Sequence, residues 1–193
     1  IVTGFGDGTS SGALLLRTHD AGTGGESGHL VLSTGYATSG NSGALFVGSG
    51  PSTVGRGGSV YVTVGSGTSG SGGEMKLVAG SSSFSTGGRL SVITGVGGKS
   101  TSGALVLQTS DAGTAGVSGI AVLSTGFAST GNSGSLYIGS GEASTGRSGS
   151  VYVTAGTGDS GDGGEIAITA GTSASDTGGR VSIVTGFSST STS

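Results

Sequence analysis

The chain has 193 residues, of which 47 are Gly and one is Pro, and only 9% are charged, with a formal net charge of −3. This composition excludes collagen, which needs Gly at every third position and abundant Pro. Seven Lys and Arg residues give no basic patch for nucleic acid or anionic membranes, and no apolar run reaches the ~20 residues of a membrane-spanning helix.

A short unit repeats along the whole chain. The twelve units begin at Ser11, Ser27, Ser42, Gly57, Gly72, Gly87, Ser102, Ser118, Ser133, Ser148, Gly163 and Gly178. The spacing is 15 residues, with one spacing of 16 in each block of 91. Because neighbouring repeats support one another, we expect a single repeat domain over 1–193. Its blocks are 1–91 and 92–182, and 183–193 begins a further repeat or a linker.

Each unit reads Ser or Gly, then Gly, then apolar residues at positions 4 and 6, a small residue at position 8 and usually Gly at position 9. Alternation with a period of two is the signal of a strand, and Gly at this density disfavours helices. The sequence therefore predicts an all-β fold, a β-solenoid of twelve coils with about 15 residues per coil. The alternative is an antiparallel β meander of twelve strands.

Charged residues at position 3 favour the solenoid over the meander. Glu74 and Arg89 occupy this position in consecutive units, and Glu165 and Arg180 repeat the arrangement in the second block. In a parallel stack these side chains lie about 4.8 Å apart on adjacent coils. We therefore predict two inter-coil ion pairs that mark the register of stacking.

Position 5 carries an apolar and aromatic row in four consecutive units of each block. Its members are Leu15, Val31, Phe46 and Tyr61 in the first block, and Val106, Val122, Tyr137 and Tyr152 in the second. If positions 4 and 6 face the core, this row faces outward, and exposed apolar patches often mark contact surfaces. Phe46, Tyr61, Tyr137 and Tyr152 are the predicted self-association residues, aided by unpaired strand edges at the ends of the solenoid.

Catalysis is not expected. An enzyme needs acid, base or nucleophilic groups that cluster, and the chain has only two His residues. His19 and His29 are replaced by Ser110 and Ile120 in the second block. We predict that the protein is not an enzyme and has neither catalytic residues nor a cofactor.

A metal site is not expected either. The chain has no Cys, and its best candidate for calcium is the string that contains Asp159, Asp162 and Glu165. The first block has Thr68 and Ser71 in place of the two Asp residues. A structural calcium ladder would recur in each coil, because calcium needs six to eight oxygen ligands per site.

The units between Ser11 and Gly186, with strings of the form GGxIxLxxGxxxSG, resemble the Gly/Ser/Thr-rich tandem-repeat β-solenoid proteins of algal and other microbial extracellular fibres and surfaces. This resemblance implies an extracellular or cell-surface location and a structural role. The expected function is a repeat segment of a fibril or filament that associates with copies of itself. The alternative is a glycan- or surface-binding adhesin module, so the expected partners are the chain itself and glycans, with no nucleic acid and no membrane span.

Overall fold

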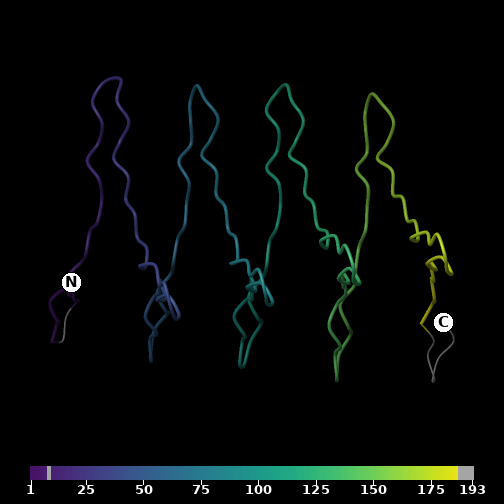
Figure 1. The fold of residues 1–193 in the computed structure, drawn as a ribbon, viewed down its shortest axis with the longest axis horizontal. Helices are drawn as coiled ribbons and strands as arrows, with labels where there is room; N and C mark the ends of the chain where they lie inside the picture. Colours follow the sequence, from purple (N-terminus) through teal and green to yellow (C-terminus); the bar gives the residue numbers. More distant parts are fainter. Residues whose placement is uncertain (8–9, 187–193) are drawn as a thin grey trace. The chain divides into compact units, whose positions relative to one another are not determined.

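The computed structural model describes residues 1–7 and 10–186. Within these residues the chain forms no helix and no strand, so the ribbon of Figure 1 carries neither coil nor arrow. It consists of irregular extended segments joined by bends. The predicted β-solenoid is therefore wrong, and so is the alternative of an antiparallel β meander.

The alternating pattern fails to make a strand because nothing pairs with or covers the segments. A strand needs a ladder of backbone hydrogen bonds and a neighbour for its apolar face. Among the described residues no side chain is buried, and Leu45 and Val47 of one segment are 57% and 76% exposed. Dense Gly also raises the entropy that ordering the backbone would cost.

The bends nevertheless keep the period of the sequence. In the first block they lie at 38–40, 53–55, 68–70 and 83–85. In the second block they lie at 98–100, 114–116, 129–131, 144–146, 159–161 and 174–176. Each bend falls in the small, polar stretch that follows position 9 of a unit. The sequence repeat is thus a repeat of local structure, although not of strands.

A hydrogen bond closes many of these loops at the same two unit positions. The backbone N–H of Gly at position 2 donates to the carbonyl of Gly at position 9 of the preceding unit. In the bond from Gly88 to Gly80 the N···O distance is 2.8 Å. The same bond joins Gly12 to Gly4, Gly58 to Gly50, Gly73 to Gly65, Gly103 to Gly95, Gly164 to Gly156 and Gly179 to Gly171.

In several units, close approach of the preceding unit leaves no room for a side chain on the Gly at position 2. A Cβ atom added to Gly58 would lie 2.9 Å from Cβ of Ser49, and one added to Gly149 would lie 3.1 Å from Cβ of Ser140. In all twelve units the position-8 side chain before the loop lies within 4 Å of this added atom. Position 8 is therefore in contact with the glycine of the next unit, and it is Ala, Ser or Thr in eleven of the twelve units; Val64 is the exception, and its loop is still closed.

The position-9 glycines have a different environment. A Cβ atom added to Gly50 or Gly141 meets nothing within 4 Å. Conformational freedom matters instead inside the loops, where Gly24 and Gly40 have φ of 88° and 119°. These angles lie in the region that L side chains rarely adopt.

The chain divides into two compact units, Ile1–Val92 and Ile93–Ser193. The division falls beside the boundary between the two sequence blocks, at 91/92. The final segment, 183–193, for which a further repeat or a linker is predicted, lies for the most part outside the described residues.

Candidate interaction surface

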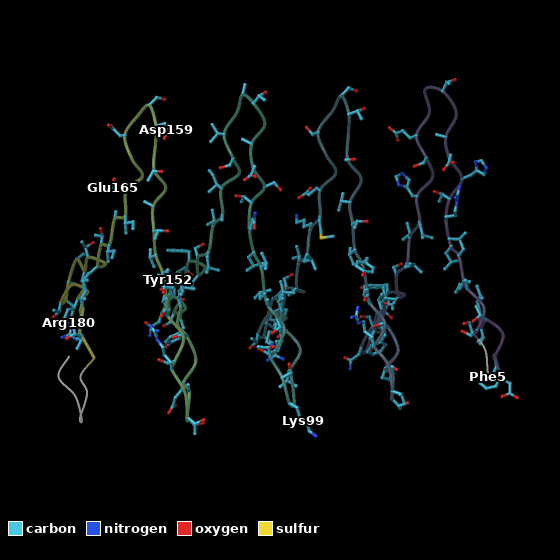
Figure 2. All side chains as sticks on the ribbon, turned by 180° about the vertical axis from the view of Figure 1, so that it is seen from behind. Phe5, Lys99, Tyr152, Asp159, Glu165 and Arg180 are labelled. Atoms are coloured by element: carbon cyan, nitrogen blue, oxygen red, sulfur yellow. The ribbon has the colours of Figure 1, made fainter. Side chains whose placement is uncertain are left out.

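The position-5 residues of four consecutive units in each block, here called the aromatic row, lie on the surface. Phe46 and Tyr61 are 91% and 86% exposed, and Tyr137 and Tyr152 are 90% and 85% exposed. Figure 2 shows the side chains projecting from the ribbon, with Tyr152 labelled. The aromatic row is therefore free to contact a partner, and its role in self-association stays a prediction.

A second set of exposed aromatic residues follows position 9, at the start of the loops. Phe5, Tyr36 and Phe127 share this place in the repeat, and each is more than nine-tenths exposed. We call them the loop aromatics. The alternating pattern within the segments does not predict these residues, because they lie outside it. The recurring strings TGF and TGY were the signal that would have found them.

The ion pair in the described part of the chain is a local one. An Nη atom of Arg17 lies 3.5 Å from a carboxylate oxygen of Asp20, and both side chains are largely exposed. Neither Glu74 with Arg89 nor Glu165 with Arg180 forms an ion pair within residues 1–7 and 10–186. Those pairs depended on stacked coils, and the described residues form no strands that could stack.

The residue at position 8 correlates with how each loop closes. Where it is Ala or Val, the backbone bond between the two glycines closes the loop, at 2.8 Å after Ala79 and 3.1 Å after Val64. Where it is Thr or Ser, a side-chain hydroxyl often donates to the carbonyl of Gly at position 2, and in the Ser49 loop the backbone bond persists beside it at a longer distance, 3.4 Å. Ser49 makes this bond to Gly58 at 2.7 Å.

The hydroxyl bond recurs in both blocks. It joins Thr18 to Gly28, Thr34 to Gly43 and Ser140 to Gly149 at distances between 2.8 and 3.1 Å. The Thr94 loop keeps the backbone bond at 2.9 Å. A hydroxyl at position 8 therefore allows the bond from the side chain but does not require it. Short hydroxyl side chains commonly compete with backbone bonds in this way.

The residues that carry acid, base or ligand chemistry do not converge. Among the described residues no three His, Cys, Asp or Glu side chains form a group that could hold a metal ion. Asp159 lies at a bend and Glu165 on the segment that follows it (Figure 2). No helix in the described part of the chain is long and apolar enough to cross a membrane.

The accessible surface area of the chain is much larger than that of a compact domain of the same mass. The chain exposes 19127 Å², whereas a compact domain of its mass, 17.8 kDa, would expose about 8,000 Å² and its extended chain about 26,000 Å². Most of the surface that folding normally removes from water remains available for contact.

No family model, no curated protein sequence and no solved structure matches the chain.

Proposed function

We propose that the chain is a structural repeat segment of an extracellular fibril or cell-surface filament that associates with copies of itself through the aromatic row. The observation that carries the proposal is the absence of any buried side chain among residues 1–7 and 10–186. Soluble monomers rarely leave large contiguous apolar patches in water. Association through strand edges, which was also expected, does not apply, because residues 1–7 and 10–186 form no strand.

The amount of exposed surface supports association over a large area. The excess over a compact domain of this mass is about 11,000 Å². One partner contributes about 800 Å² to a standard protein–protein interface. The chain therefore has surface for several interfaces at once, as a fibril component needs.

The charge and the repeat support a copy of the same chain as the partner. A net charge of −3 on 193 residues gives little repulsion between copies. The aromatic row of the first block returns 91 residues later in the second, with Phe46 matched by Tyr137 and Tyr61 by Tyr152. Because one chain presents the surface twice, copies can join without closing into a dimer, which permits open-ended assembly.

Sedimentation velocity over a range of concentrations tests the proposal. We expect the wild-type chain to shift from monomer to large species as concentration rises, with filaments under the electron microscope. A variant with Phe46, Tyr61, Tyr137 and Tyr152 all changed to Ser removes most of the apolar surface of the row. We expect it to remain monomeric at concentrations where the wild type assembles.

A matched control changes the loop aromatics instead. The variant with Phe5, Tyr36 and Phe127 changed to Ser loses three aromatic side chains instead of four, each at similar exposure, but outside the aromatic row. We expect it to assemble like the wild type. Equal loss of assembly in both variants would show that general hydrophobicity drives association. A wild-type chain that stays monomeric at every concentration would refute the proposal.

A further inference from the structure

We propose that the tyrosines of the aromatic row are sites of oxidative phenol coupling between copies of the chain, so that the assembly becomes covalently crosslinked through dityrosine. The inference rests on the proposed function and adds a modification to it. A chain without Cys cannot form disulfides, and it has only two Lys residues, Lys76 and Lys99. Phenol rings are the crosslinking groups that the repeat supplies in both blocks.

The four tyrosine side chains are accessible to an oxidant and to tyrosines of other copies of the chain. Tyr36, Tyr61, Tyr137 and Tyr152 are between 85% and 92% exposed. Tyr61 and Tyr152 occupy the same place in the two blocks, 91 residues apart. Each block contains at least one tyrosine of the row, so one chain can couple to more than one neighbour.

The reaction balances with hydrogen peroxide as the oxidant and a haem peroxidase as its activator. Each phenol loses one electron and one proton, which gives a phenoxyl radical. Two radicals form a carbon–carbon bond between the ring positions next to their oxygens, and the two hydrogens on those carbons move to the oxygens. In sum, two tyrosines and one hydrogen peroxide yield one dityrosine and two waters.

Coupling selects phenols that already lie together, because radicals are short-lived. Tyr36 provides an internal comparison, since its exposure of 92% exceeds the 86% of Tyr61, yet it is a loop aromatic. If exposure alone decided coupling, Tyr36 would react at least as well. If copies meet along the aromatic row, Tyr61, Tyr137 and Tyr152 react together and Tyr36 does not.

The test treats an equal mixture of unlabelled and nitrogen-15-labelled chains briefly with peroxidase and hydrogen peroxide. Denaturing gels measure the crosslinked dimer. Mass spectrometry identifies mixed-isotope peptide pairs that have lost two hydrogens. We expect the Tyr61→Phe, Tyr137→Phe, Tyr152→Phe triple variant to lose crosslinked dimer at least several-fold, and the Tyr36→Phe variant to keep the wild-type yield.

Sedimentation of the same proteins before oxidation measures assembly separately from crosslinking. Phe preserves the apolar ring, so the triple variant should still assemble. Wild-type chains that assemble but do not couple, or that couple as well through Tyr36 as through the row, overturn the crosslinking alone. Chains that remain monomeric overturn both the crosslinking and the proposed function.

Discussion

A pair of alanine substitutions at the two ends of one loop tests how the repeat folds locally. Gly58→Ala places a Cβ atom 2.9 Å from Cβ of Ser49, closer than such atoms approach in proteins. The loop must open, which weakens the 2.7 Å bond from the Ser49 hydroxyl to the Gly58 carbonyl. Gly50→Ala, at the other end of the loop, places its Cβ atom in open space.

The two substitutions should change the free energy of loop closure in opposite directions. Loss of one neutral hydrogen bond costs about 1 kcal/mol, which lowers the closure equilibrium of the Gly58→Ala loop about fivefold. Ala at position 50 restricts the open chain and should favour closure by about 0.4–1 kcal/mol. The difference arises from one close contact, because both glycines belong to the same loop and are exposed.

Nuclear magnetic resonance of the dilute chain measures the result. The cross-relaxation signal between the Ser49 β protons and the α protons of residue 58 reports closure, and it should fall in Gly58→Ala and rise in Gly50→Ala. The second block offers an independent pair, Gly149→Ala and Gly141→Ala, in which only the first has a close neighbour. Equal behaviour of the two alanines in both blocks would refute the close-approach argument.

Three further predictions concern the same loops and the chain as a whole. Ser49→Ala removes the hydroxyl, so the bond from Gly58 N–H to the Gly50 carbonyl should shorten from 3.4 Å. Hydrogen exchange of the Gly58 amide should then slow. Unchanged exchange would contradict the idea that the hydroxyl bond and the backbone bond compete to close the loop. Differential scanning calorimetry of dilute monomer should show no cooperative peak, because little apolar surface is removed from water; a sharp peak would mean a buried core. Asp20→Asn should leave the chemical shifts of distant residues unchanged at low and high salt, because exposed ion pairs contribute little.

The repeat period could be predicted from the sequence, and so could the location of the bends. Small and polar residues recur after position 9 of each unit, and a bend forms in that stretch every 15 or 16 residues. The aromatic row at Phe46, Tyr61, Tyr137 and Tyr152 could also be identified from its spacing. Local chain direction and side-chain size depend on neighbouring residues, which a sequence pattern records directly.

The expected strands could not be derived in the same way. Alternation at Leu45 and Val47 describes a segment able to pair, but pairing requires a partner segment in the right register. Residues 1–7 and 10–186 provide no such partner strand, and Glu74 and Arg89 form no ion pair there. The apolar side chains of the described segments therefore stay largely exposed.

The 15-residue period, the residue at position 8, the glycine at position 2 and the aromatic row can all be identified from the order of residues alone. The role of that glycine becomes visible only in the folded loop. It lies against the preceding position-8 side chain with a negative or extended φ, and the glycines with positive φ, such as Gly24 and Gly40, lie within the loops. The physical reason is that close approach depends on two residues brought together by a bend, whereas the period belongs to the order of residues along the chain.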